Sequence, residues 1–123
     1  MAKLSKKTLD GNVETLILAV LGDGPTYGYD LVNRLNERGG GLLKMGEGTI
    51  YPVLHRMEER GLLTATWRDG PLSSGGGGRR RKYYRVTVAG KKAMAENRAQ
   101  WQGLVTVMEN VLKPGPRGAV KAV

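Results

Sequence analysis

The stretch "SSGGGGRRRKYYRV", from Ser73 to Val86, joins a run of four glycines to four basic residues and a pair of tyrosines. Segments rich in strand-forming residues lie on both sides of it, "LLTATWR" at 62–68 and "KYYRVTV" at 82–88. Two strands joined by a flexible glycine and serine loop make a hairpin with a long tip. We therefore expect a β-hairpin that carries a cluster of positive charge.

The glycine run is not a linker between two domains. The chain of 123 residues has the size of one domain, and only 45 residues follow Gly78. A second core that small would need disulfides or a metal ion. The sequence has no cysteine and a single histidine, His55, so neither kind of cross-link is available.

Charge indicates the class of partner. The chain has 20 Lys and Arg against 11 Asp and Glu, a net charge of +9 and a pI near 10.1. An excess of this size favours a polyanion, either nucleic acid or an anionic membrane surface. The apolar run "LILAVL" at 16–21 is too short for a bilayer span and lacks the flanks of a signal peptide. We expect a cytoplasmic protein, with which the absence of cysteine agrees.

Three helices are predicted before the hairpin. In the first, apolar residues recur at helical spacing and form one face: Val13, Leu16, Ile17, Val20 and Leu21. Asp10 or Asn12 can cap its start, and Gly22 with Pro25 can end it. The second helix takes Thr26 as its N-cap, and its apolar face comprises Tyr27, Leu31 and Leu35. Gly28 would let another helix approach this one closely, at a cost of about 1 kcal/mol in helix propensity.

The third helix lies in "EGTIYPVLHRMEERGLL", residues 47–63. Its apolar face comprises Ile50, Val53, Leu54 and Met57, and Gly61 supplies the stop. Proline is tolerated in the first turn of a helix, where a backbone N–H has no helical partner. Thr49 as the N-cap would place Pro52 in that turn, whereas a start nearer Gly48 would leave some strain.

The last predicted helix is long for so small a protein. Thr87 can cap a helix over 88–112, which spans roughly 38 Å and stops before Pro114. Its apolar seam comprises Trp101, Leu104, Val105, Met108, Val111 and Leu112, with Met94 one heptad before Trp101. Three short helices cannot cover this seam, so we expect a second copy of the chain to do so. The tail, 113–123, is predicted to be disordered.

The order of elements predicts a mostly α protein with a small β-hairpin, a winged helix-turn-helix. The DNA-binding domain would occupy 8–87, and the helix at 88–112 would form a homodimer. In such folds the third helix enters the major groove of double-stranded DNA with its N-terminal residues against base edges. The side chains near its start that could contact DNA are Thr49, Tyr51, Pro52, His55 and Arg56. The basic residues of the hairpin, or wing, could reach phosphates or the minor groove: Arg79, Arg80, Arg81 and Lys82.

Each of these residues also has a simpler interpretation. Tyr51 could pack on the neighbouring helix, Arg56 could pair with Glu59, and the wing could be a solvated loop. His55 and Glu59 are two metal ligands without a third, so no metal site is predicted. The sequence contains no P-loop pattern and no paired nucleophile and base, so we expect neither an enzyme nor a cofactor.

Three blocks in this order resemble the PadR family of bacterial transcriptional regulators: "PTYGYDL" at 25–31, "GTIYPVLHRMEERGLL" at 48–63 and "RRRKYYRVTVAGKKAM" at 79–94. The resemblance runs from about Val13 to Leu112. It implies a homodimer that represses transcription from an inverted-repeat operator, with Thr49, Tyr51 and Pro52 at the DNA surface. The single C-terminal helix is similar to that of the smaller subfamily. The wing segment "GPLSSGGGG" departs from the family pattern because it is longer and richer in glycine.

The resemblance also implies a site for an effector. In multidrug-sensing members of the subfamily, a tryptophan in the last helix flanks a pocket at the dimer interface and stacks on flat aromatic ligands. Trp101 is similar in position, and the seam residues around it that could line such a pocket are Met94, Leu104 and Met108. The simpler interpretation of Trp101 is interface packing.

Three functions follow from these patterns. The first is a ligand-responsive, sequence-specific repressor. The second is an architectural protein that binds DNA without sequence preference. The third is an interaction module whose basic face docks on an acidic protein or membrane, although the exposed start of the third helix suits a groove better than a flat surface. A membrane partner is therefore not expected.

Overall fold

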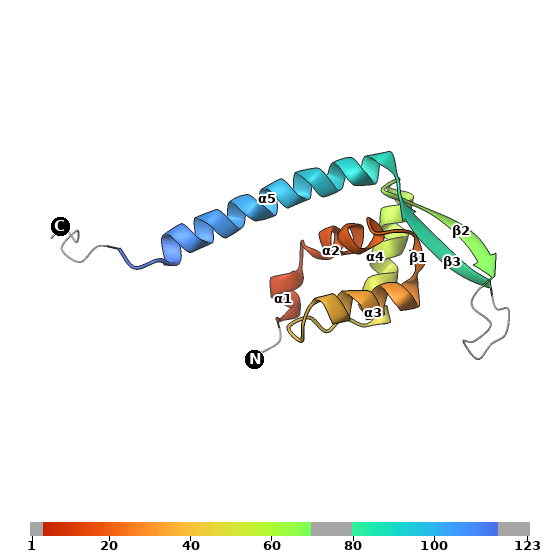
Figure 1. Cartoon of the computed structure of the whole chain (residues 1–123), viewed down its shortest axis with the longest axis horizontal. Helices are drawn as coiled ribbons and strands as arrows, with labels where there is room; N and C mark the ends of the chain where they lie inside the picture. The colour runs from red at the N-terminus through yellow and green to blue at the C-terminus, as the bar shows by residue number, and fades with distance from the viewer. Residues whose placement is uncertain (1–3, 70–79, 116–123) are drawn as a thin grey trace.

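The computed structural model describes residues 4–69 and 80–115. Its elements are α1 (Lys6–Leu9), α2 (Val13–Leu21), β1 (Thr26–Tyr27), α3 (Gly28–Arg38), α4 (Glu47–Glu59), β2 (Leu63–Asp69), β3 (Arg80–Val86) and α5 (Val88–Leu112). Figure 1 shows α1 to α4 grouped beside the base of the β2–β3 wing, while α5 runs out at the opposite end of the molecule. The predicted mostly helical, winged fold is confirmed. The segment 70–79, which includes Arg79 and the glycine run, lies outside the described residues, as does 116–123.

The sheet has three antiparallel strands in the order β1–β3–β2. The wing pairs from Leu63 with Val86 to Asp69 with Arg80. The additional strand, β1, pairs Thr26 with Tyr84 and Tyr27 with Tyr83. The prediction that Thr26 caps the second helix is therefore wrong. Its backbone pairs with β3, as suits a β-branched residue, and its hydroxyl donates to Asp30 Oδ2 at 2.5 Å.

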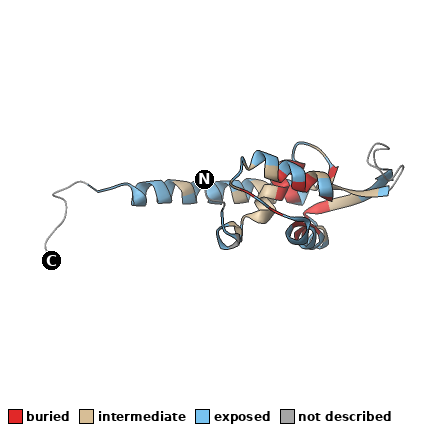
Figure 2. Ribbon diagram, turned by 90° about the horizontal axis from the view of Figure 1, so that it is seen from below, coloured by how far each residue is buried: buried red, intermediate tan, exposed pale blue. Residues whose placement is uncertain are grey.

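A single core lies between α2, α3, α4 and the base of the sheet. Its fully buried side chains are Ile17, Leu18, Leu31, Ile50, Leu54, Met57 and Leu63. The predicted apolar face of α4 is buried in full, whereas Val13 and Leu16 of α2 are only partly buried. Figure 2 shows that the buried residues gather within the short helices and the base of the sheet and are nearly absent from α5. Helical periodicity thus identified the buried face of α4 and most of the buried residues of α2 and α3, but it missed Leu18.

The start of α4 differs from the prediction that takes Thr49 as the N-cap, and it lies nearer the alternative start at Gly48. The helix begins at Glu47 with Gly46 as its N-cap, two residues before Thr49. Pro52 therefore lies inside the helix, beyond the first turn, and cannot donate a hydrogen bond to the carbonyl of Gly48. Gly48 is exposed, so water can reach that carbonyl. This exposure lowers the cost of the proline.

The start of α5 is fixed to the end of α4 and the base of the wing. The prediction that Thr87 caps α5 is confirmed, because its Oγ1 accepts a hydrogen bond from the Gly90 N–H at 3.0 Å. The same hydroxyl can donate to the carbonyl oxygens of Gly61 at 2.6 Å and Leu62 at 3.0 Å. A Cβ on Gly90 would lie 2.2 Å from the Leu62 carbonyl oxygen, so only glycine permits this approach.

Beyond its first turns, α5 leaves the core. Ala93 and Met94 pack against the core, but the apolar residues further along are exposed, except Val105, which is partly buried. The exposed residues are Trp101, Leu104, Val107, Met108, Val111 and Leu112. Within the described part of the chain, no helix is long and apolar enough to cross a membrane.

Candidate nucleic-acid interface

The outward side of α4 carries all five side chains that the sequence predicts there. Thr49, Tyr51, Pro52, His55 and Arg56 are each exposed. At 100° per residue, Tyr51 falls on the flank of the helix that faces the wing, whereas Thr49 and Arg56 fall on the opposite flank. Pro52 and His55 lie between them. The helix therefore presents one continuous exposed ridge that runs from Thr49 in its first turn to Arg56 in its last turn. The predicted position near the start holds for Thr49, Tyr51 and Pro52, whereas His55 and Arg56 lie in the second half because the helix begins at Glu47.

The flank of Thr49 borders a shallow groove of about 510 Å³ next to the turn between α1 and α2. Across this groove, Arg60 Nη1 donates to Glu14 Oε2 at 2.7 Å, so the charge of Arg60 is paired. Arg56 also lines the groove but has no ion-pair partner within residues 4–69 and 80–115. Its guanidinium is therefore available to an external acceptor.

The alternative pairing of Arg56 with Glu59 does not form. Glu59 Oε1 instead lies 3.3 Å from His55 Nε2, and both side chains are well exposed. No cluster of three or more potential metal ligands occurs in the part of the chain that the structure describes. His55 thus stays on the ridge as a polar side chain beside a carboxylate.

Tyr51 owes its position to Gly28, the first residue of α3. A Cβ on Gly28 would lie 2.1 Å from Cε1 of the Tyr51 ring, so the missing side chain makes room for the ring. The predicted close approach at Gly28 is confirmed. Tyr51 is still 43% exposed, and partial burial, reinforced by the carboxylate of Glu47, raises its pKa above the ordinary value. The phenol therefore stays protonated at neutral pH and can donate a hydrogen bond.

A larger groove of about 760 Å³ lies between the start of α3, α4 and the wing; we call it the wing groove. It is lined by Tyr27, Gly28, Tyr29, Tyr51, Trp67, Arg80, Arg81, Lys82 and Tyr84. Five of these residues are aromatic, three are cationic and none is acidic. Cations and aromatic rings in one groove suit a sugar–phosphate strand.

Three aromatic residues of the wing groove were not among the predicted site residues: Trp67, Tyr29 and Tyr84. Trp67 lies opposite Lys82 in the register of the wing, and strand alternation places both on the same side of the sheet as Tyr84. The pairing register of β2 with β3 depends on the length of the hairpin tip, which the sequence pattern does not define. Tyr29 lies in α3, as the predicted second helix implies, but Tyr27 was assigned to that helix and is a residue of the short strand β1.

The basic residues of the wing do not act as one cluster. Lys82 Nζ lies 2.7 Å from Oε1 of Glu58, a residue of α4, and 5.3 Å from the centre of the Tyr84 ring. The hydrogen bond to Glu58 raises the pKa of Lys82 and outweighs the effect of its partial burial. Arg81 instead stacks on Tyr27, with its Cζ 4.4 Å from the ring centre. Arg80 is exposed at the end of β3.

A separate apolar cavity of about 200 Å³ lies between α2 and α5. It is lined by Asn12, Thr15, Leu16, Ala19, Met94, Arg98 and Trp101. Of the four predicted effector-binding residues, the structure therefore brings Met94 and Trp101 together. Leu104 and Met108 lie further along α5, outside this cavity and exposed.

The model of the transcriptional regulator PadR-like family matches residues 17–96, a span that includes α3, α4, the wing and the start of α5. The chain belongs to this family. It is thus a DNA-binding transcriptional regulator and not an enzyme. Among curated relatives, Transcriptional regulator Rv3488 of Mycobacterium tuberculosis is 37% identical over 84 residues, covering 67% of this chain and 68% of that protein.

Solved structures of PadR-like regulators are similar along most of the chain. A PadR-like transcriptional regulator from Bacillus cereus has a TM-score of 0.75 and 32% identity, covering 89% of this chain and 100% of that one. A transcriptional regulator from Clostridium thermocellum has a TM-score of 0.76 and 27% identity, covering 89% and 99%. Both alignments cover nearly the whole of the compared chain.

The contact between Gly28 and Tyr51 predicts the effect of Gly28→Ala. The new Cβ must push the Tyr51 ring out of its position beside the wing groove. Because the ring lies at the surface and can turn aside, we expect a cost to folding of about 1 kcal/mol, or a few degrees in Tm. DNA affinity should fall by roughly tenfold, since about 1.4 kcal/mol of contact is displaced.

A double-mutant cycle separates this effect from a general disturbance of α3. In a Tyr51→Ala background, the ring is gone and Gly28→Ala should weaken DNA binding no further. Fluorescence anisotropy with a labelled duplex measures the affinities, and circular dichroism measures the melting. Additive losses in the two variants would show that Gly28 does not act through Tyr51.

The ion pair between Glu58 and Lys82 predicts that Lys82 acts through α4. Glu58→Lys and Lys82→Glu each place two like charges face to face, so each should loosen the wing and weaken DNA binding. The double variant Glu58→Lys/Lys82→Glu restores opposite charges with no change in net charge. We expect it to bind DNA within about twofold of the wild type, because a pair at this exposure contributes only about 1 kcal/mol to stability.

The control for the added charge is Glu59→Lys, one residue along α4, where the partner is His55 and not the wing. This variant should retain wild-type affinity or exceed it. If the charge-swapped double variant binds as weakly as Lys82→Glu alone, then Lys82 contacts DNA directly. In that case Lys82→Met should also reduce the salt dependence of binding by about one phosphate contact per chain.

Proposed function

We propose that this PadR-like regulator is a cytoplasmic repressor that binds an inverted-repeat operator as a homodimer and is released by a flat aromatic effector. The observation that carries the proposal is the apolar face of α5, which extends beyond the core while α4 and the wing present an exposed basic surface. In this arrangement 8–87 bind DNA and 88–112 hold the dimer together.

The face of α5 supports a homodimer. Trp101, Leu104 and Met108 are 53%, 54% and 47% exposed, and they lie on one side of the helix with Val111 and Leu112. A monomer rarely leaves an apolar face of this length uncovered. A second α5 with the same seam covers it, and the twofold axis makes each contact twice.

The twofold axis gives the operator its symmetry. Two copies of α4 related by the axis would enter successive major grooves about one DNA turn apart, so the half-sites form an inverted repeat. Thr49 and Pro52 lie in the first half of α4 and Arg56 in its last turn, all exposed on one side of the helix, where they would meet base edges. The strand between the two grooves would pass along the wing groove.

The cavity between α2 and α5 supports the effector part of the proposal. Met94 and Trp101 form one wall, and Thr15 and Leu16 of α2 form the other. The neighbouring residue of α2, Glu14, bonds to Arg60 next to the end of α4. A ligand that widens the cavity would therefore displace the same short helix that contacts α4. This connection gives the effector a route to the DNA-binding surface.

Non-specific architectural binding is the second candidate, and the net charge of +9 favours it. Selection of duplexes from a randomised library separates the two functions. We expect an inverted repeat, two chains per duplex and a preference of about a thousandfold, or roughly 4 kcal/mol, over a scrambled duplex. Equal and steeply salt-dependent binding to both duplexes would establish the architectural function instead.

The variant Leu104→Glu/Met108→Glu tests the dimer, with sedimentation and affinity for the selected operator as the measurements. Both side chains are exposed in the protomer, so the variant should fold, sediment as a monomer and lose at least about a hundredfold in operator affinity. The control Ala99→Glu/Asn110→Glu adds the same charge on the opposite side of α5 and should remain dimeric. A dimeric Leu104→Glu/Met108→Glu variant would overturn the role of α5.

The effector site predicts quenching of Trp101 by a planar aromatic probe such as 2-naphthol. The measurement uses a Trp67→Phe background, so that all tryptophan emission comes from Trp101. We expect saturable quenching and release of the operator over the same range of probe concentration. Release should be lost in Trp101→Ala. Quenching without any change in operator affinity would show that the cavity binds aromatic molecules but does not regulate.

A further inference from the structure

The side of the sheet that points away from α4 carries a second basic surface. We call it the outer face, and it comprises Thr64, Thr66 and Arg68 of β2 with Tyr83 and Arg85 of β3, which together line a cleft of about 140 Å³ beside Pro25. Strand alternation puts these residues opposite to Leu63, Lys82 and Val86, which face the core and α4. The outer face therefore lies on the other side of the sheet from Trp67, Lys82 and Tyr84 of the wing groove, and the two surfaces touch where Tyr27 of the groove contacts Tyr83.

Stacking holds the arginines of this surface in place. Arg68 Cζ lies 3.8 Å above the centre of the Tyr83 ring. The Tyr83 ring contacts the edge of Tyr27 at 5.3 Å between centres, and Arg81 covers Tyr27 in turn. A guanidinium that stacks on a ring keeps its N–H edge for planar acceptors such as phosphate. Less side-chain entropy is then lost when an anion binds.

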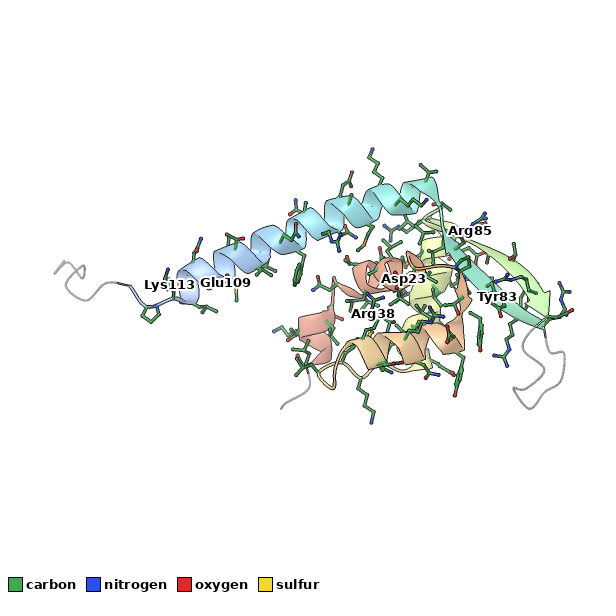
Figure 3. All side chains as sticks on the ribbon, viewed as in Figure 1. Asp23, Arg38, Tyr83, Arg85, Glu109 and Lys113 are labelled. Carbon is green, nitrogen blue, oxygen red and sulfur yellow. The ribbon has the colours of Figure 1, made fainter. Side chains whose placement is uncertain are left out.

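The positive charge of the outer face is not neutralised within the described part of the chain. Arg68 and Arg85 are exposed and make no ion pair among residues 4–69 and 80–115. No carboxylate lines the cleft, and Lys91 of α5 lies near Arg85 at the border of the neighbouring surface. Figure 3 shows Tyr83 and Arg85 following one another along β3 at the wing end of the molecule.

We propose that the outer face binds the phosphates of the DNA that flanks each operator half-site. The inference rests on the proposed binding of an operator by α4 and the wing. With α4 in the major groove and the wing over the adjacent backbone, the outer face is directed along the duplex, away from the half-site. Guanidinium, hydroxyl and phenol groups are the side chains that most often contact phosphate and sugar.

The chemistry of the outer face favours a nucleic acid over an acidic protein. Protein–protein interfaces have an apolar or aromatic centre that is desolvated on binding. On the outer face the one aromatic ring, Tyr83, is already covered by Arg68 and Tyr27, and the remaining side chains are polar. Contacts to phosphate need no such centre. In a twofold dimer the two outer faces would lie at the two ends of the operator.

The test compares two duplexes that contain the selected operator, one trimmed to the inverted repeat and one extended by a helical turn of random sequence at each end. We expect the wild-type protein to bind the extended duplex about tenfold more tightly at low salt. Arg68→Ala/Arg85→Ala should bind both duplexes alike, with wild-type affinity for the trimmed one. The loss of two arginines from each of two chains should also reduce the slope of log affinity against log salt concentration on the extended duplex by about three to four.

The matched control is Lys92→Ala/Lys113→Ala, which removes one exposed cation from α5 and one from the residue that follows it, and should keep the preference for the extended duplex. Circular dichroism checks that both variants fold. The proposal is overturned if Arg68→Ala/Arg85→Ala keeps the preference, or if it weakens binding to both duplexes equally. A wild-type protein without any preference also overturns it and leaves an acidic protein as the partner of the outer face. If the wild type has no selectable operator, the proposed function fails first, and this inference fails with it.

Discussion

The carbonyl group of Leu62 is the point at which α4, the wing and α5 are fixed to one another. Its oxygen accepts hydrogen bonds from the backbone N–H of Thr87 at 3.1 Å and from the Thr87 hydroxyl at 3.0 Å. Gly90 approaches the same oxygen so closely that no side chain fits between them. Leu62 lies in the short turn between α4 and β2, and Thr87 joins β3 to α5. The directions of the proposed DNA-binding helix and of the proposed dimer helix are therefore tied to one joint.

The helix α2 connects the core, α5 and the end of α4, because each of its sides contacts a different one of them. Ile17, Leu18 and Leu21 are buried in the core, Thr15 and Leu16 line the proposed effector cavity, and Glu14 bonds to Arg60 next to the end of α4. Nine residues thus contact the core, α5 and the neighbourhood of α4 at once. A helix this short has little stability of its own and follows its contacts, which makes it a suitable link between ligand and DNA.

Local patterns in the sequence predicted the parts of the fold that depend on local physics. The apolar stripe of α4, the cap at Thr87 and the close approach at Gly28 all follow from residue type and spacing, and the structure confirms each of them. The errors arose where distant segments decide the outcome. Thr26 has the chemistry of a helix cap, but pairing with Tyr84, far along the chain, makes it a strand residue. In the same way, the ion pair between Glu58 and Lys82 depends on how α4 lies against the wing, which spacing along the chain does not encode.

Counting consecutive basic residues in the sequence overstates the positive charge on one side of the wing and misses the positive charge of the outer face. The four consecutive basic residues of the wing suggest a single arm that grips DNA. Strand alternation divides them instead: Lys82 turns towards α4 and is neutralised by Glu58, while Arg81 turns to Tyr27. Arg68 and Arg85, which are isolated in the sequence, come together on the outer face only because β2 and β3 pair. The basic side chains of the wing therefore form two surfaces with the sheet between them. In the proposed complex, a duplex that follows α4 and the wing groove has to bend or extend past the sheet to meet both.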